Sequence, residues 1–363
     1  MKLALIGRYG EREIVAGPER VARELFFELK KNNPQTVFIE YFFSGYANSS
    51  IYKKLFGKEF IHDNSIVRLG IFPLITFLVK EEFKIIHIVN LQRFILILFF
   101  LKPFIKSKIT ATLHGFLRYE IPRKNLFIKR YFIDLWVEKL IISKCKLCVY
   151  PSRLLFETFS NNYNISNKKY EIIPNGISEI FKSQNRNFPP INNSLRIVFY
   201  NGFNENINKG LPELIVLLKD VNFKIEFFVV GKKVDIESSG NFKIIYSGTK
   251  SHQEMIRLLD DKHFVVKSPT FEPFSIFVAE CMISGVIPIV NQNVGIKDFI
   301  KHNFNGFIYD SLSLTDLSRL IEEIFEGKYD LDIISTNAKK IFETLNWNKV
   351  TRQYYQSFKG IMK

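Results

Sequence analysis

Cysteine is scarce in this sequence, with three residues among 363. So few thiols in so long a chain exclude a scaffold built on disulfides and indicate a reducing compartment. Cys145 and Cys148 form a C-x-x-C pair, but no second Cys or His pair stands near it at zinc spacing. We therefore expect all three cysteines, Cys281 included, to be buried packing residues.

Long apolar runs and several well-known signatures are also missing. The longest apolar run covers residues 94–101, whereas a helix that spans a bilayer needs about 20 apolar residues. Only five apolar residues precede Arg8, which is too few for the core of a secretion signal. The sequence contains no P-loop and no G-x-G-x-x-G, so ATP and NAD sites are disfavoured. No His, Cys and carboxylate cluster has metal-ligand spacing, and we expect no metal cofactor.

Positive charge, by contrast, is abundant and unevenly distributed. The formal net charge is +15, and residues 1–175 hold 28 basic and 15 acidic side chains against 23 and 21 in residues 176–363. Such an excess favours a phosphorylated or otherwise anionic partner. Nothing in the chain resembles a nucleic-acid-binding module, so we expect no nucleic acid among its partners.

Short β-rich apolar runs alternate with segments of helical periodicity, a pattern that predicts an α/β fold with parallel sheets covered on both faces. Strands are expected at residues 2–7, 36–43, 66–72, 85–90, 108–114 and 147–152, and again at 196–200, 224–230, 243–247, 264–267 and 287–290. Helices are expected at residues 17–31, 93–101, 128–143, 153–162, 209–221, 251–261 and 274–284.

A polar, proline-containing segment at residues 181–194 indicates a linker between two domains. It separates an N-terminal domain, residues 1–180, from a C-terminal domain, residues 195–345. We expect both domains to be Rossmann-like. The last segment, residues 346–363, is expected to form a helix that packs back on the N-terminal domain.

The densest chemical signal lies within residues 267–310. A strand ends there, a loop carries Glu272, and a helix begins near Phe274. The N-terminus of this helix would present free backbone N–H groups of Ser275 and Ile276 to an anion. Two turns further on, the carboxylate of Glu280 could accept two hydrogen bonds from a vicinal diol such as a ribose.

This segment resembles the donor-binding half of the retaining glycosyltransferases of family 4, which have the GT-B fold. Glu272 and Glu280 match the family's pair of glutamates separated by seven residues, and the IPIV and NGF segments follow in the family's order. The AGPERVARELFFEL, TLHG and IIPNGI segments extend the resemblance over almost the whole chain. It implies two Rossmann-like domains that face each other across a cleft.

The resemblance also implies roles for single residues. Glu272 corresponds to the acid that lies against the donor sugar, and Glu280 to the acid that binds the nucleotide ribose. Lys209 matches the lysine of a basic pair that neutralises the donor diphosphate, where negative charge builds up as the glycosidic bond breaks. His114 matches a histidine that approaches the donor sugar, and Gly17 a glycine that allows close approach of backbone to phosphate.

Three further residues, Phe274, Ser275 and Ile276, fall in the donor-binding turn. One position departs from the family pattern, because Phe203 stands where an arginine usually precedes the lysine. Lys209 and the helix N-terminus could then carry the charge, or Lys232 or Lys250 could replace the arginine.

The basic excess is concentrated in residues 93–153, with 13 basic and three acidic side chains interleaved with aromatic ones. This mixture suits an anionic lipid surface, although a solvated basic face over a buried helix is the plain alternative. We therefore expect a cytoplasmic protein, peripheral at the inner face of the cytoplasmic membrane.

Together these patterns predict a retaining glycosyltransferase that moves a sugar from a UDP- or GDP-linked donor. The expected acceptor is a glycan or a polyprenyl-diphosphate-linked saccharide, as in bacterial lipopolysaccharide O-antigen or capsule synthesis. Two alternatives stay open at this point: a nucleotide-sugar epimerase of the same fold, and a non-catalytic nucleotide-sugar-binding protein, which the missing arginine would suit.

Overall fold

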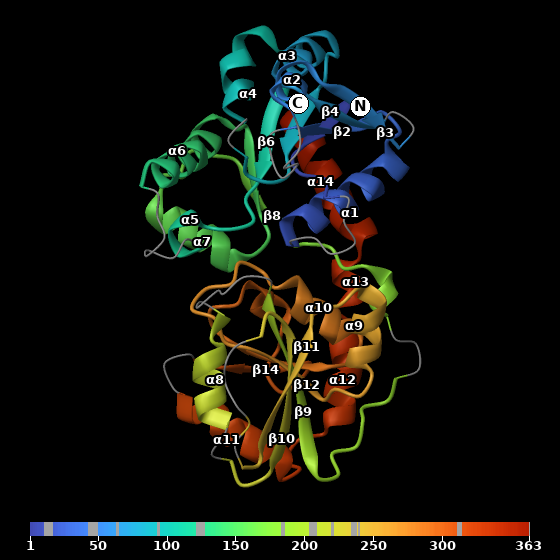
Figure 1. Cartoon of the computed structure of the whole chain (residues 1–363), viewed down its shortest axis with the longest axis vertical. Helices are drawn as coiled ribbons and strands as arrows, with labels where there is room; N and C mark the ends of the chain where they lie inside the picture. The colour runs from blue at the N-terminus through green and yellow to red at the C-terminus, as the bar shows by residue number, and fades with distance from the viewer. Residues whose placement is uncertain are drawn as a thin grey trace. The chain divides into compact units, whose positions relative to one another are not determined.

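The computed structural model describes residues 1–10, 17–42, 50–62, 65–92, 95–120, 128–182, 186–202, 209–218, 221–233, 238, 240–310 and 314–362. The chain forms two compact units: unit 1 comprises residues 1–176 with 347–363, and unit 2 comprises residues 177–346. Each unit is an α/β domain built on a largely parallel sheet (Figure 1), as the alternating pattern predicts.

Unit 1 contains an eight-stranded sheet of order β3-β4-β2-β1-β5-β6-β7-β8, in which β3 alone is antiparallel to its neighbour. Its strands are β1 (Leu3–Ile6), β2 (Thr36–Tyr41), β3 (Lys58–Ile61), β4 (Ile66–Leu69), β5 (Ile85–Ile88), β6 (Lys108–Thr112), β7 (Leu147–Tyr150) and β8 (Tyr170–Ile172). Its helices are α1 (Gly17–Asn32), α2 (Ile51–Phe56), α3 (Ile71–Lys80), α4 (Ile95–Leu101), η1 (Lys102–Phe104), α5 (Leu117–Glu120), α6 (Ile128–Lys144), α7 (Arg153–Asn162) and α14 (Trp347–Met362).

Unit 2 contains a six-stranded parallel sheet of order β11-β10-β9-β12-β13-β14. Its strands are β9 (Ser194–Gly202), β10 (Lys224–Gly231), β11 (Phe242–Gly248), β12 (Phe264–Lys267), β13 (Ile287–Asn291) and β14 (Phe307–Tyr309). Its helices are η2 (Glu179–Phe181), α8 (Leu211–Leu218), α9 (His252–Leu259), α10 (Ile276–Ile283), η4 (Gly295–Phe299), α11 (Leu314–Phe325), α12 (Leu331–Lys339) and α13 (Phe342–Leu345).

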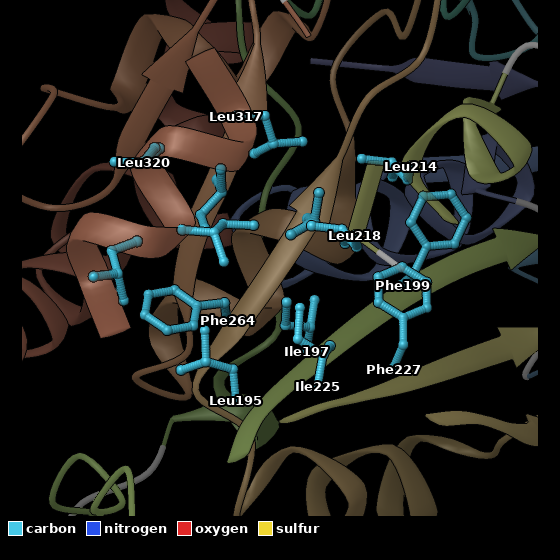
Figure 2. Close-up of a cluster of buried hydrophobic side chains, with 14 of the residues drawn as sticks. Leu195, Ile197, Phe199, Leu214, Leu218, Ile225, Phe227, Phe264, Leu317 and Leu320 are labelled. Atoms are coloured by element: carbon cyan, nitrogen blue, oxygen red, sulfur yellow. The ribbon is translucent and has the colours of Figure 1, made fainter. Parts of the chain in front are cut away.

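Alternate residues of β9 point into two separate cores of unit 2. Ile197 and Phe199 belong to one buried cluster, and Val198 belongs to the other. Figure 2 shows the first cluster, in which the strand residues pack against Leu214 of α8 and Leu317 of α11. Because side chains of a strand alternate between its two faces, a parallel sheet with helices on both sides needs apolar residues at consecutive positions.

The segment at residues 181–194, expected to link the domains, lies within unit 2. The Arg186 side chain, 9% exposed, donates hydrogen bonds at 2.8 Å to the carbonyls of Asp260 and Ser284 and a third to that of Lys262. The chain instead passes between the units at residues 176/177 and again at 346/347. The low hydropathy of this segment suggested a free linker. Its one arginine, however, binds carbonyl groups at the ends of helices and turns, which would otherwise have no hydrogen-bond partner.

The strand expected at residues 66–72 is wrong at its end. β4 stops at Leu69, and Gly70 is the N-cap of α3, a helix that begins at Ile71. α3 has the sequence IFPLITFLVK, and such an apolar run shows neither the period of a helix nor that of a strand. None of the helices in the described ranges has the length and hydropathy that a bilayer span requires.

Candidate functional site

The candidate site of unit 2 lies where the direction of strand order reverses. From β9 the chain adds β10 and β11 on one side, and then β12 and β13 on the other. The carboxyl ends of β9 and β12 therefore lie at the switch point of the sheet, the usual ligand position in open α/β sheets. Lys267 is the last residue of β12, and Lys209 follows β9 in the chain.

Lys209 reaches this point because the next residue is a glycine. Gly210 has a φ of +76°, and a Cβ atom there would lie 1.8 Å from the carbonyl oxygen of Ser268. Only glycine can bring the start of α8 so close to the end of β12.

Two lysines bind one carboxylate oxygen at the switch point. The Nζ atom of Lys209 lies 2.6 Å from Oε2 of Glu272, and the Nζ atom of Lys267 lies 3.4 Å from the same oxygen. The side chain of Lys267 is 2% exposed and also donates to the carbonyl of Tyr200 at 3.3 Å, whereas that of Lys209 is 21% exposed. Lys267 is thus the buried member of the pair and Lys209 the accessible one.

Burial and neighbouring charges shift the pKa values of Glu272 and Lys267. Burial would raise the pKa of Glu272, but Lys209 and Lys267 outweigh it and lower that pKa to about 2. Burial and the neighbouring Lys209 lower the pKa of Lys267 to about 8, although Glu272 acts in the opposite direction. At neutral pH Glu272 is therefore a carboxylate, and Lys267 is an ammonium group that loses its proton as the pH rises through about 8.

The loop that carries Glu272 is held by backbone hydrogen bonds on both sides. The Glu272 N–H donates to the carbonyl of Asn293 at 2.9 Å, and its own carbonyl accepts from the N–H of Gly295 at 2.9 Å. The carbonyl of Phe274 accepts from the N–H of Ile296 at 2.8 Å. These backbone hydrogen bonds hold the loop in place and so fix the point from which the Glu272 side chain projects.

Ser275 is the N-cap of α10 and has the left-handed backbone angles φ 78° and ψ 78°. Non-glycine residues seldom adopt this conformation, and strained positions of this kind cluster at functional sites. It directs the loop into α10, so that Ile276 is the first helical residue. The ring of Phe274 is 2% exposed and packs edge-on against Phe299, so this residue can contact a ligand only through its backbone.

Glu280 lies on the second turn of α10 and is 4% exposed. The rest of that helix is IFVA and CMI, apolar side chains that belong to the core. A buried carboxylate in such a helix is unfavourable unless it has a polar partner. Packing alone would favour an apolar residue at this position.

The other two predicted site residues belong to unit 1. His114 follows β6, is half-buried and is hydrogen-bonded to the backbone of Val89. Burial lowers the pKa of His114 to about 4, so that the ring is neutral at pH 7. Gly17 is the exposed first residue of α1.

The structure brings Lys209 and Glu272 together and adds Lys267, which the sequence analysis missed. Neither Lys232 nor Lys250, suggested there as replacements for the missing arginine, is the second lysine at Glu272. A lysine that ends an otherwise apolar strand, FVVK, was the signal that could have revealed it. Phe203 lies outside the described residues.

The remaining candidates have structural roles. His87 is fully buried on β5, and its ring nitrogens lie 2.8 and 3.0 Å from the hydroxyl oxygens of Thr110 and Thr112. All three cysteines are buried, as expected. Within the part of the chain that the structure describes, no group of three His, Cys, Asp or Glu side chains could hold a metal ion.

Comparison with known proteins gives two family matches. Residues 181–341 match the family model described as Glycosyl transferases group 1, and residues 15–179 match the model described as Glycosyltransferase Family 4. An uncharacterized glycosyltransferase of Methanocaldococcus jannaschii is 23% identical over 122 residues. That match covers 33% of this chain and 31% of the relative's own length.

Solved structures resemble the chain over nearly its full length. Sucrose-phosphate synthase from Thermosynechococcus elongatus is 15% identical with a TM-score of 0.74, covering 99% of this chain and 98% of its own. The lipopolysaccharide outer core galactosyltransferase WaaB is 14% identical with a TM-score of 0.73, covering 98% and 100%. Anabaena HepE, solved in complex with UDP and glucose, is 15% identical with a TM-score of 0.70, covering 99% of each chain. At these identities the likeness shows a shared fold.

Proposed function

The chain belongs to the group 1 glycosyltransferases of GT-B fold, and on that premise we propose that it transfers a sugar from a nucleotide-diphospho-sugar to an acceptor glycan with retention of anomeric configuration. The donor binds at unit 2. The observation that carries this proposal is the contact of Lys209 and Lys267 with Glu272 at the switch point between β9 and β12.

Positive charge at this point suits the leaving group. As the glycosidic bond breaks, negative charge develops on the departing diphosphate, and an ammonium group placed beside it stabilises the transition state more than the ground state. Lys209 is the exposed member of the cluster and contacts the diphosphate. The free N–H groups at the N-terminus of α10 add to this positive field. These groups supply the charge without a metal ion, so transfer continues in the presence of EDTA.

Glu272 orients the donor sugar and does not exchange protons with the acceptor. With a pKa of about 2 it stays ionised throughout the physiological range, so it cannot act as a general acid and is a weak general base. An ionised carboxylate accepts hydrogen bonds from sugar hydroxyls, and Glu280 does the same for the ribose. A reaction without a strong general base at unit 2 fits retention, in which the departing phosphate itself takes the acceptor proton.

The acceptor belongs to unit 1. His114 of that unit is neutral and can donate a hydrogen bond to a sugar hydroxyl or accept one from it, which suits the role toward the donor sugar that the resemblance implies. The basic character of residues 93–153 favours an acceptor with a phosphate group. We assign the reaction to bacterial surface polysaccharide synthesis, with a polyprenyl-diphosphate-linked saccharide as acceptor and UDP or GDP as the nucleotide. The protein then works at the inner face of the cytoplasmic membrane.

Donor binding is tested by thermal shift with UDP-, GDP-, ADP- and CDP-sugars, because a bound ligand raises the melting temperature by mass action. We expect one nucleotide class to stabilise the wild type and the Glu280→Ala variant to lose that shift. Glu213→Ala, an exposed acid on α8, is the matched control and keeps it. Transfer is then measured with the identified donor, and proton NMR of the product reports the anomeric configuration.

Two results would contradict the proposal. Wild-type transfer by Glu272→Ala would show that the site lies elsewhere, and a product of inverted configuration would rule out retention. Conversion of the donor to an epimer without any acceptor would favour the epimerase alternative. Stabilisation by a donor with no turnover on any acceptor would favour a binding protein.

A further inference from the structure

Helices cover the sheet of unit 1 in two layers. Connections between parallel strands are right-handed. A connection that advances along the sheet in the direction from β1 to β2 therefore lies on the opposite face from one that advances from β5 to β6. By this rule α1 covers one face, and α3, α4 and α6 cover the other, since β4 to β5, β5 to β6 and β6 to β7 all advance in the same direction. α14 joins α1, and Figure 1 shows this pair across the sheet from α4 and α6.

The outer surface of the second layer is apolar and largely aromatic. Phe100 and Phe104 are each 72% exposed, Phe132 is 61% exposed, and the other exposed large residues of this layer are Phe72, Val79, Ile133 and Trp136. On α3, the ring of Phe72 stacks on Phe56 of α2 with centroids 5.1 Å apart, so the apolar surface continues onto that helix. Apolar side chains that gather on the surface of a folded protein mark interaction sites.

The opposite layer provides an internal comparison. Up to its last turn, the exposed residues of α14 are polar or charged: Asn348, Lys349, Arg352, Gln353, Gln356 and Lys359. Both layers belong to one sheet and one chain, so a general excess of phenylalanine does not explain the difference. The exposed aromatic residues of α4 and α6 have no counterpart on α14, whereas Phe27 of α1 is 39% exposed.

Charge on the apolar layer has one predominant sign. Exposed lysines lie on or beside it at Lys80, Lys106, Lys139, Lys144 and Lys146. Of the acids on or beside these helices, Glu82 is exposed and Asp134 of α6 is half-buried. Glu138 of α6 is fully buried and accepts hydrogen bonds from the Tyr163 hydroxyl at 2.7 Å and the Leu117 N–H at 3.2 Å. Exposed aromatic rings between lysines are typical of proteins that lie on anionic bilayers.

We propose that the outer surface of α3, α4 and α6 docks on an anionic lipid bilayer, with the aromatic side chains in the headgroup region and the lysines at the lipid phosphates. This inference rests on the proposed function for the lipid-linked acceptor, but not on the donor site. A second copy of the chain is the less suitable occupant, because a two-fold interface would place these lysines against themselves.

Flotation with phospholipid vesicles tests the surface. We expect the wild type to bind phosphatidylcholine vesicles that contain about 30% phosphatidylglycerol and to bind pure phosphatidylcholine weakly. Phe100→Ser/Phe104→Ser/Trp136→Ser should lower the partition constant by about tenfold or more. The matched control, Val216→Ser/Ile333→Ser, removes residues of unit 2 that are 59% and 58% exposed and should bind as the wild type does.

A charge variant separates the two contributions. In the variant Lys106→Gln/Lys139→Gln/Lys144→Gln, each substitution should weaken binding to the anionic vesicles by about fivefold. Added salt should also weaken the binding of the wild type. Thermal shift with the donor nucleotide, measured on the same variants, should stay at the wild-type value because the donor site is in unit 2. If the donor nucleotide produced no thermal shift in the wild type, that result would count against the proposed function and not against the docking surface.

Three outcomes would overturn the docking proposal. The wild type could remain in the soluble fraction with anionic vesicles. The aromatic variant could bind them as tightly as the wild type. Sedimentation in the absence of lipid could show a wild-type oligomer that the aromatic variant converts to monomers, which would make a second copy the occupant.

Discussion

Lys209 and Lys267 approach the same atom, Oε2 of Glu272, at 2.6 and 3.4 Å. The two differ in freedom, since Lys267 is buried and also bonded to the carbonyl of Tyr200, whereas Lys209 is partly exposed. Under the proposed function Lys209 can turn to the donor diphosphate while Lys267 stays with Glu272. The carboxylate, largely buried, then keeps a partner, and leaving it without one would be costly.

Lys267 predicts the upper pH limit of donor binding. Its pKa of about 8 lies below the ordinary value of 10.5, so the ammonium group loses its proton, and its charge, as the pH rises through about 8. A diphosphate brings negative charge and raises that pKa again, so binding near pH 8 should take up a proton. Calorimetric titration with the donor nucleotide in two buffers of different ionisation enthalpy measures this uptake.

In Lys267→Met the proton uptake should disappear, whereas Lys267→Arg should retain affinity above pH 8 because guanidinium does not titrate there. An unchanged proton uptake in Lys267→Met would assign the titration to another group.

Lys209→Ala should lower kcat by about 10²-fold or more, since an interaction that strengthens in the transition state is lost. The donor KM should change much less. Lys243→Ala removes an exposed lysine of β11 in the same unit and is the control for net charge. Steady-state transfer assays check both variants, and a loss confined to KM would reduce Lys209 to a residue of ground-state binding.

Ser275→Gly should raise the free energy of unfolding of unit 2 by about 0.5–1 kcal/mol. The left-handed conformation is unfavourable for a serine and free of strain for a glycine, and part of this gain is offset by the greater freedom of glycine in the unfolded chain. Ser275→Val should have the opposite effect. Differential scanning calorimetry compares the two, and equal melting temperatures would show that the backbone there can relax.

Acid should destabilise unit 1 through His87. Burial, with His114 contributing, lowers the pKa of His87 to about 3 from an ordinary value of 6.5. The unfolded state therefore binds the extra proton first, and stability is intact above pH 6.5 and is lost as the pH falls toward 3. At pH 5 the loss should be about 2 kcal/mol relative to pH 7.5.

Tryptophan fluorescence in urea measures this effect in unit 1, because Trp136 and Trp347 are the two tryptophans of the chain and both belong to that unit. His87→Gln should remove about half of the pH dependence between pH 5 and 7.5, because His114, with a pKa of about 4, contributes the rest. A slope equal to that of the wild type would place the responsible proton on another group.

The sequence alone determined the fold class, two parallel-sheet α/β domains. Strands that are buried on both faces consist of continuous apolar runs, and these runs can be recognised because they alternate with segments of helical periodicity. It also singled out Glu272 and Glu280, which lie close in the chain on one loop and the helix that follows it. Lys209 came from the family resemblance, and the roles of all three residues stay predictions. Its errors lay where local pattern is ambiguous, as in the apolar helix α3 and the polar segment at residues 181–194.

Only the tertiary structure decided the rest. Lys267 meets Lys209 because β12 lies beside β9 in the sheet, a neighbour relation that no local pattern encodes. The aromatic residues of α4 and α6 are evident in the sequence, but only the structure shows which of their rings are exposed, because hydrophobicity does not state which side of a helix faces the sheet. Contacts between distant segments decide both which charges share a carboxylate and which apolar surface stays uncovered.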